Sequence, residues 1–242
     1  EKDTVLPVAT GDLTGIKDRP DYVKDYPVKD SAGAVREVIV NGPYWSEQGT
    51  HAILDIRSQD NKDRWIALLD AATGKLKTLN RQRDEAWVAG PGIGWSMGGA
   101  NIGWIDETTC WYQSENSGYS HLYTTNVTNG NTRQLTSGNY EVQQAQLSND
   151  KKHFYIVTNE VHPGEKQLYR IAVTGGKAER LTTMEGAHEV SISPDEKWIA
   201  FRYSYSNKPW ELYLQANMAG AKPVQVTNLA QSAEFRAYNW RD

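Results

Sequence analysis

The same pattern of turns and apolar residues recurs along this chain at regular intervals, and this repeat limits its possible folds. Leu79, Leu135, Leu181 and Val226 end successive segments, and the last two intervals between them are 46 and 45 residues. An aliphatic residue lies 13 residues before each of the first three ends, and a glycine lies 5 before it. These residues are Ile66, Leu122 and Leu168, and then Gly74, Gly130 and Gly176. Because a tight hairpin needs a residue with positive φ, each glycine predicts a turn between two strands.

Residues 187–227 show most clearly what one repeated unit contains. Val190 and Ile192 alternate with polar residues, a Ser-Pro-Asp-Glu-Lys turn follows at 193–197, and apolar residues alternate again from 199 to 205. Two further runs lie at 210–214 and 223–227. Alternation with a period of two, broken by Pro, Gly and Asp, predicts short antiparallel strands. Four strands in about 40 residues is the size of one blade of a β-propeller.

The repeat predicts an all-β chain with about four complete, four-stranded antiparallel blades. We place them at residues 35–85, 101–138, 139–184 and 185–228. Residues 1–34 are expected to form a loop-rich lead-in or a partial blade, 86–100 an inter-blade insertion, and 229–242 the first strand of a further blade. The chain would then be a segment of a larger propeller, or its two ends would complete a fifth blade. A β-sandwich also has closely spaced strands, but it does not repeat a four-stranded unit with fixed offsets.

Composition agrees with half-buried sheets and excludes several classes of function. The 242 residues include nine Trp and thirteen Tyr, whose rings pack on pleated surfaces while their polar groups reach water. The net charge is −4 and both signs are scattered, so no basic stripe for nucleic acid is present. No apolar run approaches the roughly 18 residues of a membrane span. The chain begins at Glu1 without a signal-peptide pattern, which we interpret as a mature or trimmed fragment, and its single Cys110 excludes an internal disulfide.

Three motifs resemble one family of propellers. They are the string WYQSENSGYSHLY at 111–123, the Ser-Pro-Asp-Glu-Lys turn at 193–197 and the Arg-Leu-Thr ending at 180–182. Over about residues 35–240 the chain resembles the N-terminal propeller of the dipeptidyl peptidase IV branch of the prolyl oligopeptidase family of serine peptidases. In that family the propeller caps an α/β-hydrolase domain and limits which peptides reach its Ser-Asp-His triad. The resemblance implies a periplasmic or secreted protein of proteolysis, with a peptide substrate and a C-terminal hydrolase domain as partners.

Gly94-Trp95-Ser96-Met97-Gly98-Gly99 is similar to the nucleophile elbow of that family, but its surroundings do not fit one. An elbow requires a buried strand before the serine and a helix after it. Here the preceding residues 90–93 are rich in Gly and Pro, and a predicted β-hairpin follows at 101. We therefore interpret Ser96 as a loop residue of the inter-blade insertion and assign no catalytic residue. No hydrolase domain can be read in these residues, so we expect the chain to be inactive alone.

The family resemblance also implies a pair of adjacent glutamates that holds the free amino terminus of the substrate, and this sequence has no Glu-Glu pair. Asp84 and Glu85 occupy a comparable position between two blades, shortly before Trp87. Because two carboxylates would attract an ammonium group, Asp84, Glu85 and Trp87 are candidate substrate-binding residues. The competing interpretation is a solvated loop. The missing pair places a strict dipeptidyl specificity in doubt.

No metal or other cofactor is expected, because the five histidines lack the paired spacing of a zinc site. They are His51, His121, His153, His162 and His188. An aspartate recurs in the first turn of three units, where its side chain is expected to bond its own backbone; these are Asp106, Asp150 and Asp195. Two other functions stay open. A free-standing TolB-like propeller would bind a protein or a glycan through its inter-blade loops, and a propeller glycosidase would need two carboxylates facing each other across a funnel.

Overall fold

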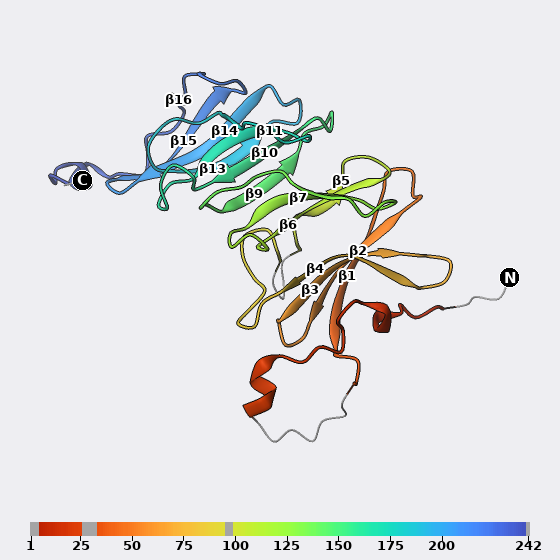
Figure 1. The fold of residues 1–242 in the computed structure, drawn as a ribbon. Helices are drawn as coiled ribbons and strands as arrows, with labels where there is room; N and C mark the ends of the chain where they lie inside the picture. Colours follow the sequence, from red (N-terminus) through yellow and green to blue (C-terminus); the bar gives the residue numbers. More distant parts are fainter. Residues whose placement is uncertain (1–4, 26–32, 95–98, 241–242) are drawn as a thin grey trace. The chain divides into compact units, whose positions relative to one another are not determined.

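The computed structural model describes residues 5–25, 33–94 and 99–240, which form mainly short strands and turns (Figure 1). The chain divides into two compact units, Glu1–Gln134 and Leu135–Asp242, and each unit contains two four-stranded sheets. Within every sheet the strands follow chain order and neighbours run antiparallel. Four-stranded antiparallel sheets of this kind are the blades of a β-propeller. The predicted all-β fold class is therefore confirmed, whereas the exact boundaries between blades stay predictions.

The first unit begins with two short 3-10 helices, η1 (Thr10–Asp12) and η2 (Asp21–Asp25), before its two sheets. The first sheet contains β1 (Val38–Trp45), β2 (Ala52–Ser58), β3 (Asp63–Leu69) and β4 (Leu76–Arg83). The second sheet contains β5 (Ile102–Trp104), β6 (Thr109–Ser114), β7 (His121–Asn126) and β8 (Thr132–Gln134).

The second unit contains the third and fourth sheets and a short helix. The third sheet comprises β9 (Val142–Leu147), β10 (His153–Thr158), β11 (Gln167–Ala172) and β12 (Glu179–Arg180). The fourth sheet comprises β13 (Ala187–Ile192), β14 (Trp198–Tyr205), β15 (Lys208–Ala216) and β16 (Val224–Gln225). The helix is α1 (Ala233–Arg236). No helix in the described ranges is long and apolar enough to cross a membrane.

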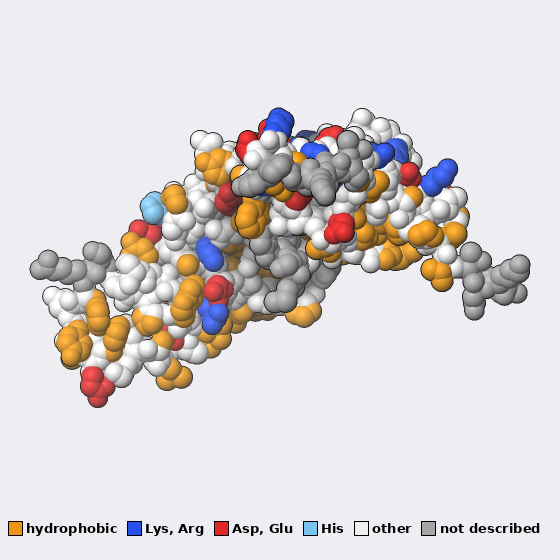
Figure 2. All heavy atoms as spheres, turned by 90° about the horizontal axis from the view of Figure 1, so that it is seen from below, with side chains coloured by type: hydrophobic (Ala, Val, Ile, Leu, Met, Phe, Trp, Pro, Cys, Tyr) orange, Lys and Arg blue, Asp and Glu red, His pale blue; other side chains and the backbone are white. Residues whose placement is uncertain are grey.

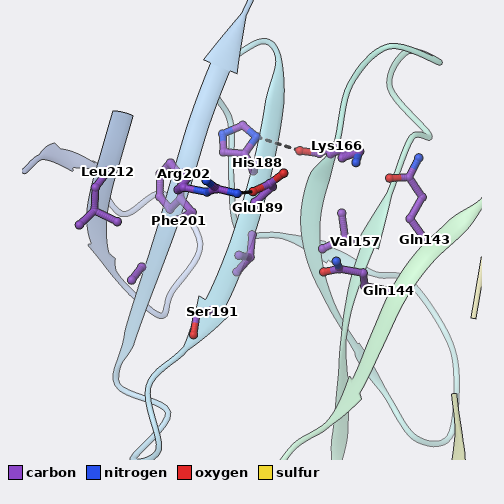
Figure 3. A pocket seen from close by; sticks show the side chains of 12 residues that line it. Gln143, Gln144, Val157, Lys166, His188, Glu189, Ser191, Phe201, Arg202 and Leu212 are labelled. Atoms are coloured by element: carbon purple, nitrogen blue, oxygen red, sulfur yellow. Dashed lines mark hydrogen bonds and ion pairs between the residues drawn. The ribbon is translucent and has the colours of Figure 1, made fainter. Parts of the chain in front are cut away.

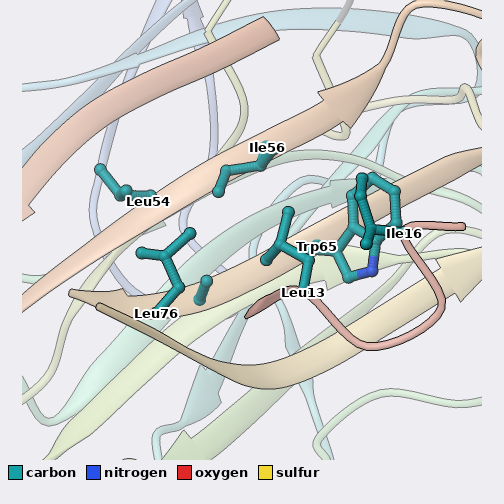
Figure 4. Close-up of a cluster of buried hydrophobic side chains, with 7 residues drawn as sticks. Leu13, Ile16, Leu54, Ile56, Trp65 and Leu76 are labelled. Atoms are coloured by element: carbon teal, nitrogen blue, oxygen red, sulfur yellow. The ribbon is translucent and has the colours of Figure 1, made fainter. Parts of the chain in front are cut away.

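The lead-in covers one face of the first sheet. Leu13 and Ile16 are each 3% exposed and pack with a cluster of buried residues from β2, β3 and β4, which includes Trp65 (Figure 4). The indole Nε1 of Trp65 donates a hydrogen bond to the carbonyl of Thr14, 2.9 Å away. Because a large buried ring needs both apolar contact and a partner for its N–H, the lead-in completes this core rather than merely preceding it.

Each unit also has a core between its two sheets. In the first unit this core includes Ile53 and Ile66 of the first sheet and Tyr112 of the second. In the second unit it includes Val157 of the third sheet and Phe201 of the fourth. Some apolar side chains stay exposed on the outer faces of the sheets, and Figure 2 shows hydrophobic side chains of this kind on the molecular surface.

The turns have the chemistry that the repeat predicts. Gly74, Gly130 and Gly176 have φ of 72°, 77° and 109°, so the predicted positive φ is confirmed. The three recurring aspartates bond the backbone of their own turns, as predicted. Asp106 accepts hydrogen bonds from the N–H groups of residues 108 and 109, Asp150 from that of residue 152, and Asp195 from that of residue 197.

The last strand of each sheet in the second unit is only two residues long, and that of the fourth sheet is shorter than the predicted run at 223–227. Just beyond each of these strands, a threonine hydroxyl takes one of the two backbone bonds of the next pair, while the other is kept. Thr182 Oγ1 accepts the backbone N–H of Leu168 at 2.8 Å, and Thr227 Oγ1 accepts that of Leu212 at 2.9 Å. The side chain thereby occupies the place of a backbone carbonyl in the ladder. This contact gives a physical reason for a Thr directly after the repeated apolar residue.

The strand predicted within residues 229–242 is wrong for the described part of this segment. The chain instead forms α1, whose N-cap Ser232 accepts a hydrogen bond from Phe235 N at 3.2 Å. The rings of Phe235 and Trp240 stack with their centroids 4.4 Å apart. A strand is stable only beside a partner strand. A capped helical turn with a local ring contact instead makes its hydrogen bonds and apolar contacts within its own segment.

Candidate functional site

The inter-blade insertion after β4 is described at residues 86–94 and 99–100, and much of it is firmly attached to the first unit. Val88 and Ile93 are 3% and 0% exposed. The carbonyl of Pro91 accepts hydrogen bonds from Ser120 Oγ at 2.7 Å and Gln113 Nε2 at 3.2 Å. Because buried apolar residues and backbone contacts both hold it, the part of the insertion at 88–94 is an ordered element of the fold. Trp95, Ser96, Met97 and Gly98 lie outside the described residues, so the interpretation of Ser96 stays a prediction.

A buried arginine binds the end of the described insertion. Arg57 on β2 donates through Nη2 to the carbonyls of Ile93, at 3.4 Å, and Gly94. Burial lowers the pKa of Arg57, and the nearby charge of Arg64 lowers it further. Arg64 itself forms an ion pair with Asp55 at 2.6 Å. Asp55 is therefore the nearby carboxylate for both Arg57 and Arg64. The carbonyl oxygens of the insertion supply further hydrogen-bond acceptors for Arg57.

Glycine is required at one point of this contact. Gly92 has φ of +68°, and a Cβ at this position would lie 1.9 Å from Oε1 of Gln113. The same amide oxygen accepts from Asn101 Nδ2 at 2.6 Å. The close approach of the backbone to this side-chain pair therefore excludes any larger residue without rearrangement.

The predicted substrate-binding residues Asp84, Glu85 and Trp87 lie together just before this insertion, but both carboxylates already have partners within the chain. Asp84 Oδ1 accepts the backbone N–H of Ala86 at 2.6 Å and that of Trp87 at 2.9 Å, and these bonds lower its pKa. Glu85 accepts the N–H of Asp21 at 2.7 Å, the first cause of its lowered pKa.

Glu85 also pairs with Arg83, whose Nη2 lies 2.5 Å from its Oε1, and the indole of Trp87 is half exposed. An ammonium group would have to compete with Arg83 for this carboxylate. The role of these three residues in substrate binding therefore stays a prediction.

A second candidate site lies in the second unit, where a groove of about 400 Å³ runs along β13 (Figure 3). The amide side chains of Gln143 and Gln144 line it from β9, and Glu189 and Arg202 form an ion pair across β13 and β14. The guanidinium of Arg202 also lies 5.6 Å from the ring centroid of Trp210. This groove offers amides and both signs of charge, which suits the backbone and side chains of a peptide. Sequence reasoning missed it, because its residues lie on separate strands with no shared motif.

His188 lines the same groove, where burial and a hydrogen bond to the backbone both hold its ring. The residue is 1% exposed, and its Nδ1 lies 2.8 Å from the carbonyl oxygen of Lys166. Because a carbonyl only accepts, Nδ1 carries the proton. Nε2 is buried and has no hydrogen-bond partner among the described residues. Burial is the main cause that lowers the pKa of His188, and Figure 3 shows its ring beside Phe201.

Among the described residues, no group of three or more His, Cys, Asp or Glu side chains is arranged to hold a metal ion. Cys110 is free and fully buried, and burial raises the pKa of its thiol to about 12. A thiol with this pKa is protonated at neutral pH and is a poor nucleophile.

The fold defines a protein with β-propeller blades, and comparison with known proteins places it in a family. Residues 24–210 match the family described as the dipeptidyl peptidase IV (DPP IV) N-terminal region. This match covers most of the chain, so the protein belongs to that family.

Similar proteins carry corresponding names. The chain is 22% identical over 212 residues to a probable dipeptidyl peptidase 4 of Emericella nidulans, covering 84% of this chain and 27% of that protein. It is 26% identical over 230 residues to a probable dipeptidyl-aminopeptidase B of Aspergillus oryzae, covering 87% and 22%. A crystal structure of a Bacteroides ovatus protein named as a dipeptidyl aminopeptidase IV has a TM-score of 0.61 and 20% identity, covering 81% and 30%. This chain thus spans less than a third of each of these proteins.

Proposed function

We propose that this chain is the non-catalytic propeller part of a dipeptidyl peptidase IV-like serine peptidase. Its role is to admit and position peptide substrates for an α/β-hydrolase domain of the same protein. The observation that carries the proposal is the family match over residues 24–210. We include in the proposal a periplasmic or secreted location, which cell fractionation with an antibody against this chain would test.

Two features of the structure support a role in positioning peptides. The groove along β13 presents amides from Gln143 and Gln144 and the charges of Glu189 and Arg202. A peptide bond both donates and accepts hydrogen bonds, and amide side chains do the same. The second feature is the insertion at 88–94, whose attachment through Arg57 fixes part of its shape before any substrate arrives. Preorganised contacts cost less ordering entropy when a ligand binds.

Peptidase activity distinguishes this proposal from its alternatives. Chain 1–242 and the full-length parent protein are each assayed with fluorogenic X-Pro peptides. We expect cleavage by the full-length protein and none by chain 1–242. Cleavage by chain 1–242 that is lost in Ser96→Ala would overturn the non-catalytic assignment. If neither protein cleaves these peptides, the peptidase proposal is rejected in favour of a binding propeller.

A further inference from the structure

The groove in the second unit runs beside a free strand edge. The fourth sheet has the order β13-β14-β15-β16, so β13 pairs with a strand of this sheet on one side only. In an antiparallel pair, every second residue of a strand directs its N–H and C=O groups at the partner, and the others direct theirs away. The N–H of Ser193, directly after β13, donates to the carbonyl of Trp198 on β14. Counting back from Ser193, the residues whose backbone groups point away from β14 are His188, Val190 and Ile192.

The chain itself already pairs with the start of this edge. Lys166 forms an isolated parallel bridge with Ala187. The N–H of His188 donates to the Lys166 carbonyl at 3.1 Å, and the N–H of Lys166 donates to the Gly186 carbonyl at 3.2 Å. Directly after Lys166 the chain enters β11 of the third sheet, so this pairing stops after one residue. The edge of β13 therefore accepts a partner strand, and the direction already begun is parallel.

Beyond this bridge, the backbone groups on the free edge have no partner. In the part of the chain that the structure describes, the N–H and C=O of Val190 and the N–H of Ile192 make no hydrogen bond. Such groups are a template for an added strand. In a parallel ladder, a residue opposite Glu189 donates to the His188 carbonyl and accepts from the N–H of Val190. A residue opposite Ser191 likewise donates to the carbonyl of Val190 and accepts from the N–H of Ile192.

The two faces of β13 differ, and this difference sets which side chains an added strand would carry. Glu189 and Ser191 project on the face that turns away from the third sheet, where Glu189 lies opposite Arg202 and forms an ion pair with it. Val190 projects on the other face and packs in the core that contains Val157. Because residues opposite each other in neighbouring strands share a face, the added strand meets polar, apolar and polar surroundings in turn.

The third sheet forms the far wall of the groove. Gln144 and Val157 lie opposite each other on β9 and β10, so their side chains share the face that turns to the fourth sheet. Figure 3 shows both residues across the groove from β13. The amide of Gln144 makes no hydrogen bond among the described residues, so its N–H groups are available to donate to a carbonyl on the second edge of an added strand.

We propose that β13 binds a segment of the peptide substrate as an added parallel strand. This inference rests on the proposed function, which makes a peptide the ligand. The bound segment has an apolar residue opposite Val190, between two polar residues opposite Glu189 and Ser191. Backbone hydrogen bonds to the strand edge supply the affinity, and the alternating side chains supply the selectivity. The propeller then holds substrates by a feature that all extended peptides share.

Calorimetric titration of chain 1–242 with capped peptides tests this inference. The probes are acetyl-Ala-Thr-Val-Thr-Ala-amide and two N-methylated forms of it, one methylated at both threonine nitrogens and the other at the valine nitrogen. In the proposed register the threonine N–H groups donate to β13, whereas the valine N–H points away from it.

We expect methylation of the two threonine nitrogens to weaken binding at least about tenfold, the equivalent of roughly 1.4 kcal/mol. Methylation of the valine nitrogen should change the affinity by less than about threefold. Equal weakening by the two modifications, or no binding of the unmethylated peptide, would overturn the proposal.

A proline variant tests the strand edge itself. Val190→Pro removes the N–H that an added strand would use, and proline is tolerated on an edge strand where the N–H has no partner strand. Val40→Pro is the matched control, because Val40 lies on β1, the edge strand of the first sheet, and its N–H likewise points away from β2. We expect Val190→Pro to lose at least about tenfold in peptide affinity and Val40→Pro to keep the wild-type value.

Circular dichroism verifies that each variant is folded. Wild-type affinity in a folded Val190→Pro protein contradicts the proposal, and if this variant does not fold, the methylated peptides decide. Sedimentation gives a further check. Self-association of chain 1–242 that Val190→Pro abolishes would make a second copy the added strand and overturn the assignment of a peptide.

The titration does not measure cleavage, so this inference and the proposed function fail separately. Cleavage of X-Pro peptides by the full-length protein without binding by chain 1–242 rejects the β13 site alone. Binding by chain 1–242 without cleavage by the full-length protein rejects the peptidase function and leaves β13 as a peptide-binding edge.

Discussion

At the scale of single residues, the first unit depends on one buried carboxylate. Asp63 is 0% exposed and accepts hydrogen bonds from three guanidinium groups. Arg36 Nη2 lies 2.5 Å away, and Arg81 Nε and Arg83 Nη1 each lie 2.7 Å away. Arg36 lies just before β1, and Arg81 and Arg83 lie on β4, so Asp63 joins distant parts of the chain. A buried charge network of this kind is sensitive to the loss of its central member.

We predict that Asp63→Ala lowers the free energy of unfolding of the first unit by about 3–5 kcal/mol, because three cations lose their shared partner. Urea denaturation followed by tryptophan fluorescence measures the change. Asp18→Ala is the control, since Asp18 pairs with Arg81 at 2.6 Å in a partly exposed position. We expect that control to cost no more than about 1 kcal/mol. An equal effect of the two substitutions contradicts the assigned role of Asp63.

His188 gives the second unit a defined pH dependence. Its pKa in the folded protein lies below the ordinary value of 6.5, first because of burial. Lys166 and Glu189, the adjacent Arg202, and the more distant Arg180 and Glu165 are the charged groups around it. Below pH 6.5 the unfolded chain takes up a proton at this histidine before the folded chain does. The contribution of His188 to the free energy of unfolding is thus complete above pH 6.5. It is lost as the pH falls from 6.5 towards the pKa of the folded state.

We predict that stability falls between pH 7.5 and 5.5 and that His188→Gln reduces this dependence. One such histidine changes the free energy of unfolding by at most about 1.4 kcal/mol per pH unit. Urea denaturation at both pH values, compared between the wild type and the variant, measures it. His162→Gln, at an exposed loop position, serves as the control and should keep the wild-type slope. A wild-type slope in His188→Gln would show that other groups carry the dependence.

At the scale of elements, the insertion at 88–94 shows how one contact orders a loop. Its backbone is held by Arg57, Gln113 and Ser120, which come from β2, β6 and the turn after β6. We predict that Arg57→Met accelerates amide hydrogen exchange at residues 92–94 by about tenfold or more, because the carbonyls of Ile93 and Gly94 lose their buried donor. Mass spectrometry of deuterium uptake measures this change.

Arg202→Met is the matched control for the insertion. Arg202 is an exposed arginine whose ion pair with Glu189 lies in the other unit. Exchange at 92–94 should stay at the wild-type rate in this variant. Unchanged exchange at 92–94 in a folded Arg57→Met protein would mean that the other contacts, from Gln113, Ser120 and the buried Val88 and Ile93, hold the insertion without Arg57.

At the scale of the whole molecule, the two units share one architecture but use it differently. Both contain two four-stranded sheets with a hydrophobic core between them. The first unit adds a lead-in that covers its outer face and an ordered insertion after β4. The second adds a polar groove along the free edge of β13. The proposed functions thus rest on residues at an insertion and a strand edge, while the repeated sheets provide the support.

The repeated features of this protein could be predicted from its sequence. Fixed offsets predicted the four-stranded units, the glycines at 74, 130 and 176 predicted turns with positive φ, and the recurring aspartates predicted bonds to their own turns. The turn glycines and aspartates depend on residues within a few positions of one another, so local chemistry suffices to predict them. The four-stranded units follow from alternation within each strand and from the regular spacing of the repeat. The motifs at 111–123 and 193–197 likewise sufficed for the family.

Contacts between residues far apart in the chain became evident only in the three-dimensional fold. Glu85 accepts a bond from Asp21, 64 positions away, and this contact occupies a carboxylate that the sequence offered as a ligand. The lead-in became part of a core through Trp65, and the segment around α1 became helical rather than a strand. In each case the outcome depends on whether a partner is available in space. Periodicity along the chain carries no information about contacts between residues so far apart in sequence.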